Sequence, residues 1–546
     1  MKPRLKTYII GEPTQAPAGS EPVIFDDLVD EINKLGQIFG EQSDGEEENV
    51  PAAQVIRRSS SEKIEQETLV VQMTDEIKDQ LDKHHKQALI IEPDEPLYPL
   101  KLEQSDNSGI PSIQNFVRSA DTEDLTVKII VQGPDGEPVN KAHVTVSGSI
   151  WIDSGLTDLK GRVKLTLPGE TEESISSVVV KPEHNYWSFR MDRPAISAGE
   201  DNKIILKRIF SNTTDGDQII GWGQKAMRLI GQSNQSKPVK IAVIDSGISV
   251  NHSDLSPDGG FDFAEDTPDG AETWNKDGSG HGTHVSGVCA GQDNQFGILG
   301  FAPEAELVVL RVFPNASNSK LIAALNWCVD NNVDVINMSL GGKGESQLVK
   351  QHMQACRENG ILPVAAAGNS GGDVLFPAAF NEVLAVAAIG QIGTFPDDSS
   401  HYARIGKNPV QSESGDYFSP EFTCRGPEVD VCAPGVAIVS TVPGNSYAAW
   451  DGTSMACPHV SGYAARLLQT RDDLSDMPRS LKRSEALSDA IIESCEFLDG
   501  IPELNQGKGL PQFGTQRPSQ PSDGSLDEVV ELIDKAIEIV ETQLVD

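Results

Sequence analysis

The spacing of apolar and polar residues changes along the chain, and residues 1–105 alternate between strand and helix patterns. The run at 4–11 is typical of a strand, and apolar residues at helical spacing follow over 23–36. A second helix is predicted to begin after Thr74, and residues 88–100 close the segment as a strand. The order strand, helix, strand, strand, helix, strand predicts a small split βαβ module of the α+β class.

Residues 122–208 show a different pattern, in which short runs of Val, Ile and Thr alternate with polar residues between turn signals. Strands at this spacing predict a β-sandwich. No nucleophile stands beside a base in this segment, so we expect a binding or spacer role. Residues 104–120, before it, are interpreted as a linker.

From 216 to 515, apolar runs such as VKIAVI at 239–244 alternate with helical stretches. Such runs are typical of strands buried on both faces, so the pattern predicts a doubly wound α/β domain with a mostly parallel sheet. Functional residues are then expected at the carboxyl ends of strands. Residues 516–546 are predicted to be a linker and an acidic amphipathic helix, which packs on this domain or pairs with a partner.

Composition narrows the range of partners. With 82 acidic and 44 basic residues the formal net charge is −38, which disfavours binding to nucleic acid. No run approaches the roughly 18 apolar residues needed to span a membrane, and the N-terminus has no apolar signal region. The number of cysteines, seven, is odd, and no two of them form a CxxC pair, so neither a disulfide framework nor a zinc site is expected. We therefore expect a cytoplasmic protein; secretion with the signal peptide absent from this sequence is the alternative.

Three polar residues stand in unusual local contexts. Asp245 directly follows the strand 239–244, His281 lies between two glycines at a predicted helix start, and Ser454 opens a helix after Gly452. Each alone has an ordinary explanation, as a turn residue or a helix cap. Together they supply a weak nucleophile, a base and a group that orients the base, which is the set that nucleophilic catalysis needs. His284 is the alternative histidine, for which we expect a structural role.

The motifs around these residues resemble those of the subtilisin-like serine proteases. The motifs are DSGI at 245–248, HGTHVSG at 281–287 and GTSMACPHVSG at 452–462. The resemblance implies a serine endopeptidase that forms an acyl-enzyme on Ser454, with His281 as base and Asp245 as its orienting group. It also implies that Asn369 donates to the oxyanion.

The same resemblance implies how substrate and metal bind. Extended polypeptide would pair with Ser339, Leu340 and Gly341, and Leu375 would partly fill the first specificity pocket. The loop 291–303 resembles the family's calcium loop, an all-oxygen site of the kind that Ca²⁺ prefers. The implied ligands are the side chains of Gln218, Asp254 and Asn294 and the carbonyls of Gln292, Phe296 and Ile298. Residues 391–420 are an insertion to which the resemblance gives no role.

The first 105 residues resemble the family's inhibitory propeptides in their order of elements. This implies a self-inhibited zymogen, with the N-terminal module as an intramolecular inhibitor. Cleavage within 96–121 would leave the β-sandwich attached to the protease, and cleavage within 209–218 would release it. The sandwich resembles carboxypeptidase-regulatory-like or Cna-B-like domains.

Two other functions remain compatible with the sequence. A non-catalytic binding protein could use the same fold, although the intact set of Asp245, His281, Asn369 and Ser454 argues against it. A maturation enzyme that cuts one partner protein could use the sandwich and the acidic tail to select that partner.

Overall fold

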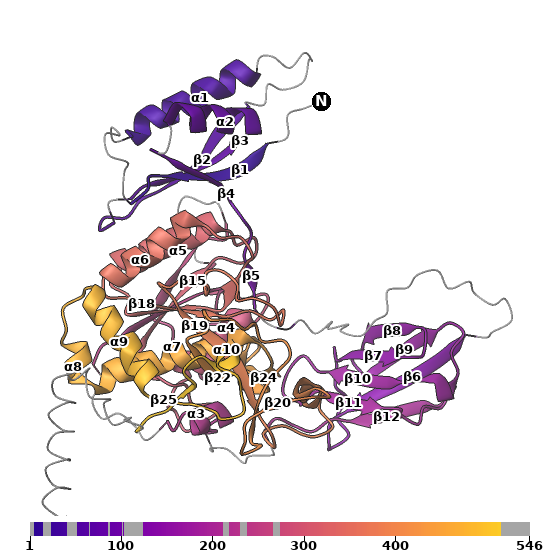
Figure 1. The fold of residues 1–546 in the computed structure, drawn as a ribbon. Coiled ribbons are helices and arrows are strands. Elements are labelled where there is room, and N and C mark those ends of the chain that lie inside the picture. The colour runs from indigo at the N-terminus through magenta and orange to yellow at the C-terminus, as the bar shows by residue number, and fades with distance from the viewer. Residues whose placement is uncertain are drawn as a thin grey trace, which may run out of the picture.

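The computed structural model of the chain describes residues 5–14, 23–40, 52–64, 66–85, 88–100, 102, 124–210, 218–229, 237–265 and 273–514. Three folded units are visible in Figure 1: an N-terminal module, a β-sandwich and a larger α/β domain. The linker expected over 104–120 and the C-terminal acidic helix lie outside the described residues. In the described part of the chain, no helix has the length and apolar character needed to cross a membrane.

The N-terminal module is a four-stranded antiparallel sheet in the order β2-β3-β1-β4, with two helices on one face (Figure 1). Its elements are β1 (Lys6–Gly11), α1 (Phe25–Gly40), β2 (Ala53–Ser59), β3 (Thr68–Met73), α2 (Asp75–His85) and β4 (Ile90–Pro93). Ile10 and Val71 on the sheet and Leu28 and Leu81 on the helices share one buried core, which follows from the alternating and helical patterns in the sequence.

The opposite face of this sheet lies against the α/β domain. Ile9, on β1, is fully buried within the core of that larger domain. On β4, Glu92 accepts hydrogen bonds from the first turn of α6 (Gln347–Glu358). Just after β4, Asp94 accepts from Ser319 in the first turn of α5 (Asn318–Asp330). A carboxylate at a helix N-terminus satisfies free N–H groups and complements the helix dipole, so these contacts fix the module on the two helices.

The β-sandwich consists of two sheets in the orders β11-β10-β7-β8 and β12-β6-β9. Val127, Ile129, Val144 and Val180 face inward and are fully buried. The elements are β6 (Leu125–Gln132), β7 (His143–Ser147), β8 (Ile152–Leu156), β9 (Arg162–Leu167), η1 (Glu172–Ser174), β10 (Ser177–Lys181), β11 (Phe189–Asp192) and β12 (Asp201–Ile205).

The third unit is built on a mostly parallel sheet in the order β14-β15-β13-β16-β18-β19-β21-β20, with β22 paired to β19. The mostly parallel α/β sheet predicted from the apolar runs is confirmed. The strands are β13 (Lys240–Asp245), β14 (Gly259–Asp262), β15 (Glu306–Arg311), β16 (Val335–Met338), β18 (Leu362–Ala366), β19 (Leu384–Gln391), β20 (Val410–Gln411), β21 (Tyr417–Ser419) and β22 (Val431–Pro434).

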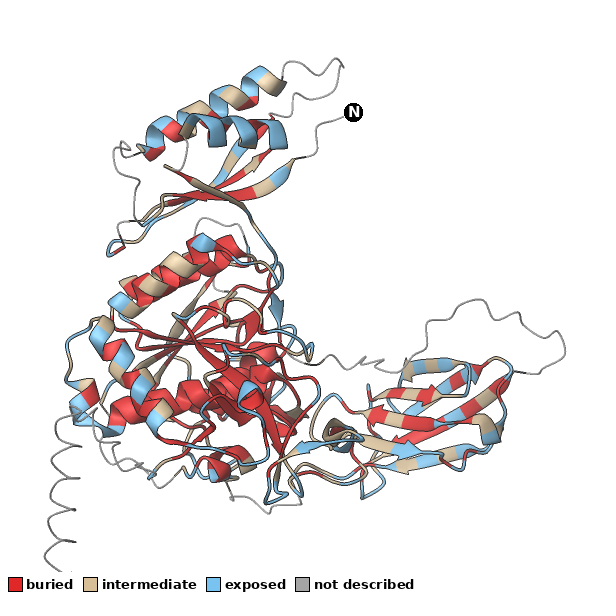
Figure 2. Ribbon diagram, in the orientation of Figure 1, coloured by how far each residue is buried: buried red, intermediate tan, exposed pale blue. Residues whose placement is uncertain are grey.

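Helices cover both faces of this sheet, with α5 and α6 on one side and α4 and α7 on the other (Figure 1). Helix α7 is buried along almost its whole length, which Figure 2 shows in red. The remaining helices are α3 (Trp222–Ala226), α4 (His281–Ala290), α7 (Thr453–Thr470), α8 (Asp472–Ser475), α9 (Leu481–Glu493) and α10 (Glu503–Gln506). Short ribbons pair β17 (Leu340–Gly341) with β5 (Tyr98–Pro99), β23 (Ile438–Val442) with β24 (Ser446–Trp450) and β25 (Cys495–Glu496) with β26 (Leu510–Pro511).

The insertion at 391–420 joins the sandwich to the α/β domain. Its 3₁₀ helix η2 (Ser400–Ile405) places His401 Nδ1 2.6 Å from Asp451 Oδ1 and Arg404 Nε 2.9 Å from Asp451 Oδ2. Burial would raise the pKa of the Asp451 carboxyl, but the His401 and Arg404 side chains and the Ala437 N–H hold it well below its usual range. The insertion also carries Asp398, which forms an exposed ion pair with Lys207 of the sandwich segment.

Replacing Asp451 by Asn should therefore lower the free energy of unfolding by about 3 kcal/mol, because a buried ion pair loses one partner. The matched Asp398→Asn variant should lose at most about 1 kcal/mol, since its pair is exposed. The pKa of Asp451 is lowered on folding, so its contribution is present above pH 4 and is lost as the pH falls further. Urea unfolding of both variants between pH 7 and pH 3 measures this. Equal losses of unfolding free energy in the two variants at pH 7, or a difference between them that grows as the pH falls, would contradict the stabilising role of Asp451.

Candidate active site

The fold brings Asp245 and His281 together in a fully buried pair. Asp245 is the last residue of β13 and His281 is the first of α4, with exposed fractions of 0% and 1%. His281 Nδ1 lies 2.7 Å from Asp245 Oδ1 and 2.9 Å from Oδ2, and the Ser246 N–H donates to Oδ1 at 2.7 Å. An N–H at Nδ1 leaves Nε2 with a lone pair, which is the form that a general base requires.

Ser454 is the second residue of α7, and its side chain is turned away from that lone pair. Its hydroxyl donates to the Ser339 carbonyl at 3.0 Å. Among the described residues, His281 Nε2 has no hydrogen-bond partner. Transfer of the serine proton to His281 therefore requires the Ser454 side chain to leave the Ser339 carbonyl and turn towards Nε2.

Two N–H donors converge on one carbonyl oxygen beside Ser454. The Leu100 carbonyl accepts from the Ser454 N–H at 3.1 Å and from Asn369 Nδ2. Asn369 follows β18, and its Oδ1 accepts from both the N–H and the hydroxyl of Thr453 at 2.9 Å. These bonds direct the amide nitrogen at the Leu100 oxygen.

Thr453 is a positioning residue that the sequence did not reveal. It lies within the motif around Ser454, and its place directly before that serine was the available signal. That it orients Asn369, 84 positions away in the chain, depends on a tertiary contact.

An extended tail from the N-terminal module crosses the site. In the β5–β17 ribbon, Pro99 pairs with Leu340 and Tyr98 with Gly341, antiparallel. The Leu100 N–H also donates to the Ser339 carbonyl at 3.1 Å. The three residues predicted to pair with extended polypeptide thus pair with a segment of the same chain.

Leu100 is 6% exposed, and its side chain lies beside Gly341, as does that of Leu375. A Cβ added to Gly341 would lie 3.1 Å from Leu100 Cδ1 and 3.3 Å from Leu375 Cβ. A side chain at residue 341 would therefore crowd Leu100. Leu375 is held there by the hydrogen bond from its N–H to the Ala367 carbonyl.

His284 has the structural role expected for it. Its Nε2 lies 3.0 Å from the Ile438 carbonyl oxygen and 3.1 Å from that of Ala448. Its ring stacks on Trp450, with centroids 4.4 Å apart and an interplanar angle of 8°.

The side chains and loop expected to hold calcium also lie together. Asp254 is fully buried, and its carboxylate accepts from three neutral groups, the Ile298 N–H, the Tyr447 hydroxyl and the Asn294 amide. Burial and the contact with Asp254 both raise the pKa of Tyr447. Gln218 donates to the Ile298 and Gln292 carbonyls. Phe296 lies in the same loop and donates its N–H to Asn294 Oδ1.

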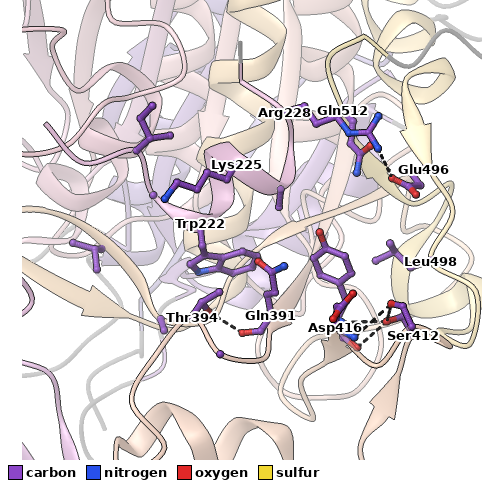
Figure 3. Close-up of a pocket in the computed structure, with 18 of the residues that line it drawn as sticks. Trp222, Lys225, Arg228, Gln391, Thr394, Ser412, Asp416, Glu496, Leu498 and Gln512 are labelled. Atoms are coloured by element: carbon purple, nitrogen blue, oxygen red, sulfur yellow. Dashed lines mark hydrogen bonds and ion pairs between the residues drawn. The ribbon is translucent and has the colours of Figure 1, made fainter. Parts of the chain in front are cut away.

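A cavity of about 950 Å³ lies outside this site (Figure 3). Trp222, Lys225 and Arg228 come from α3 and the residues after it, and Gln391 and Asp416 come from β19 and the insertion. None of Asp245, His281, Asn369 and Ser454 lines it. We assign it no part in catalysis.

The comparisons with known proteins agree with this geometry. A family profile described as Subtilase family matches residues 236–509. Subtilisin DY of Bacillus licheniformis is 38% identical over 259 residues, which span 46% of this chain and 84% of that protein.

Two relatives from Bacillus subtilis (strain 168) show similar identities. Subtilisin E is 39% identical over 45% of this chain and 59% of its own length. The major intracellular serine protease is 36% identical over 49% of this chain and 79% of its own length. The chain belongs to the subtilase family and is a subtilisin-like serine endopeptidase.

Proposed function

We propose that this endopeptidase is made as a latent precursor, whose N-terminal module blocks the catalytic site with the tail that ends at Leu100. The observation that carries the proposal is the Leu100 carbonyl, which accepts hydrogen bonds from the Ser454 N–H and from Asn369 Nδ2. The tail then occupies the site as the residues before a cleaved bond would, and Leu100–Lys101 is the first bond that the enzyme cuts.

The positions of the residues around the Leu100 carbonyl support a separate role for each of them in the reaction. His281 takes the proton of Ser454 while the serine oxygen attacks the carbonyl carbon, and Asp245 stabilises the imidazolium that forms. The negative charge on the carbonyl oxygen is stabilised by the Ser454 N–H and Asn369. His281 then gives its proton to the leaving amine, and water hydrolyses the acyl-enzyme by the same steps.

The contacts of the module support inhibition as well as cleavage. The tail is held by backbone pairing with Leu340 and Gly341, and the sheet behind it buries Ile9 against the α/β domain. Glu92 and Asp94 add charge-assisted hydrogen bonds to two helix N-termini. Since these contacts do not involve the scissile bond, they persist after it is cut, and the cleaved module remains a competitor of substrate.

The position of Leu100 also favours the earlier of the two cleavage ranges, 96–121. A cut there leaves the β-sandwich joined to the protease. We further propose a preference for medium-sized apolar residues before the cut bond, because the side chains of Leu100 and Leu375 both lie beside Gly341.

We propose that a structural Ca²⁺ binds between the loop 291–303 and Asp254. The fit rests on the donor set: a buried carboxylate with neutral partners, and two carbonyl oxygens that converge on the Gln218 side chain. Turning the amides of Gln218 and Asn294 would make the set all-oxygen, as calcium prefers. Such an ion would tie residue 218 to this loop and stabilise the fold, without a part in the chemical step.

We propose an intracellular location for this enzyme. All seven cysteines are free and buried, as in a reducing compartment, and one relative is named as an intracellular protease. Fractionation of the source cells checks this, and recovery of the enzyme only in the culture medium would contradict it.

Ser454→Ala should lower turnover by roughly 10⁶, the loss known for the triad of subtilisin, with the fold unchanged. His281→Ala should cost about as much, and Asn369→Ala about 10²–10³. A matched control is Ser286→Ala, because the buried Ser286 hydroxyl has no partner among the described residues. Rates of peptide hydrolysis and of labelling by a fluorophosphonate are measured for the three active-site variants and for the control. A Ser454→Ala enzyme within tenfold of wild type would disprove the mechanism.

Calcium should raise the melting temperature of the Ser454→Ala protein by about 5 °C or more over the chelated form, because it binds only the native state. Asp254→Asn should remove most of that rise. Asp293→Asn is the control, a loss of charge in the same loop but outside the ligand set. Calorimetry on demonstrably metal-free protein makes the comparison, and equal responses of the two variants would rule out the site.

Leu100→Asp should slow self-cleavage of the full chain by at least tenfold, because a charge would enter an apolar pocket. Tyr98→Asp is the matched control, since the Tyr98 side chain is 59% exposed and its pairing uses only backbone groups. Gel analysis over time measures the rate of self-cleavage of both variants.

Inhibition is tested separately from cleavage. Residues 1–100, which have a core of their own, should inhibit the processed enzyme when added back. No inhibition at high micromolar fragment would overturn the latency proposal even if the chain still cuts itself.

A further inference from the structure

The tail continues beyond the catalytic serine, and Leu102 marks where the chain leaves the site. The Leu102 N–H donates to the Asp451 carbonyl at 3.2 Å. If Leu100–Lys101 is the cut bond, as proposed above, Leu102 is the second residue after it, the P2′ residue. Its half-buried side chain packs against the core of the α/β domain.

Beside Leu102 lies a small cavity whose walls come from three parts of the chain. The sandwich contributes Lys181, Pro182 and Tyr186, and the insertion contributes His401 and Arg404. The end of β24 contributes Ala449 and Trp450.

We propose that the β-sandwich and the insertion build the enzyme's P2′ specificity pocket, which selects an apolar side chain two residues after the cut bond. This gives a specific role to the sandwich, for which the sequence indicated only binding or spacing, and to the insertion, to which the resemblance gave none.

The sandwich wall is fastened in place on both sides. Asn185 exchanges hydrogen bonds with Tyr447 next to the cavity: the Asn185 N–H donates to the Tyr447 carbonyl at 2.6 Å, and Asn185 Oδ1 accepts from the Tyr447 N–H at 3.1 Å. On the other side, the hydroxyls of Ser188 and Ser400 lie 2.7 Å apart. This contact joins the residue just before β11 of the sandwich to η2 of the insertion. The residues between these contacts, including Tyr186, therefore have a fixed position relative to Ser454.

The packing of Leu102 and the apolar part of the walls favour an apolar occupant. Pro182, Tyr186, Ala449 and Trp450 offer apolar surface beside the polar side chains of Lys181, Ser188 and Ser400. The positive charge of Arg404 is paired with the Asp451 carboxylate, 2.9 Å away, and His401 Nδ1 contacts the same group. An acidic P2′ side chain would compete with that buried carboxylate, whereas an apolar one leaves the ion pair intact.

The test uses the processed full chain and internally quenched peptides with the sequence of residues 95–104, in which the P2′ leucine is kept or replaced by Gly or Asp. Leucine should give kcat/KM at least about tenfold above glycine, since a side chain in a fitted pocket discriminates at this level. Tyr186→Ala should reduce that ratio to below threefold, while the preference for Leu over Asp before the cut bond stays unchanged. Mass spectrometry confirms that each peptide is cut between Leu and Lys.

Tyr186→Phe is the matched control, because it keeps the ring and loses only the 2.7 Å hydrogen bond to Glu137. It should keep the wild-type ratio. If Tyr186→Ala fails to fold, Pro182→Trp approaches the pocket from the same wall and should shift the preference towards glycine. A wild-type ratio of leucine to glycine within twofold, or an unchanged ratio in a folded Tyr186→Ala or Pro182→Trp variant, would overturn the proposal. These peptides report on the pocket whether or not the N-terminal module inhibits, so the two proposals fail separately.

Discussion

The Leu100 carbonyl and the two N–H groups that bind it are the contact on which the arrangement of this molecule depends. Both donors are held by the fold: Ser454 as the second residue of helix α7, and Asn369 because Thr453 holds its amide. A carbonyl in this position requires an extended chain on either side, which sets the pairing of β5 with β17. The N-terminal sheet lies against α5 and α6, where its acidic residues meet helix N-termini.

Asp451 is the second point at which separate parts of the chain meet. Its carboxylate is held by the insertion, its carbonyl accepts the Leu102 N–H, and it stands three residues before Ser454. The sandwich is fastened to the same region through Asn185 and Ser188. The β-sandwich, whose sequence is compatible with a spacer, thus lies beside the tail at Leu102, where the tail passes beyond Ser454. In the account proposed here, the precursor tail occupies the specificity surfaces before and after the cut bond at once.

The sequence was sufficient for the parts of the structure that depend on local pattern. Continuous apolar runs predicted the parallel strands, and the motifs around Asp245, His281 and Ser454 predicted residues that the fold brings to one edge of the sheet. Calcium binding at Asp254 and its loop stays a prediction, although the side chains lie together.

Contacts between distant segments could not be predicted in the same way. Nothing in the sequence around Thr453 says that it orients Asn369, and nothing in 391–420 says that His401 and Arg404 reach Asp451. The sandwich surface near Tyr186 has no motif, because its role follows from where the domain is attached. The rotamer of Ser454, turned to the Ser339 carbonyl, is also a property of the packed site rather than of its motif.

The central claim is that the tail ending at Leu100 occupies the active site as a substrate does, and the first self-cleavage site tests it most directly. Intact-mass and N-terminal analysis of the freshly expressed chain, sampled during processing, identifies the first bond that is cut. The account predicts a product that begins at Lys101 and retains the β-sandwich, and a Ser454→Ala chain that stays whole. A first cut within 209–218, or processing at Lys101 by the Ser454→Ala chain alone, would contradict it.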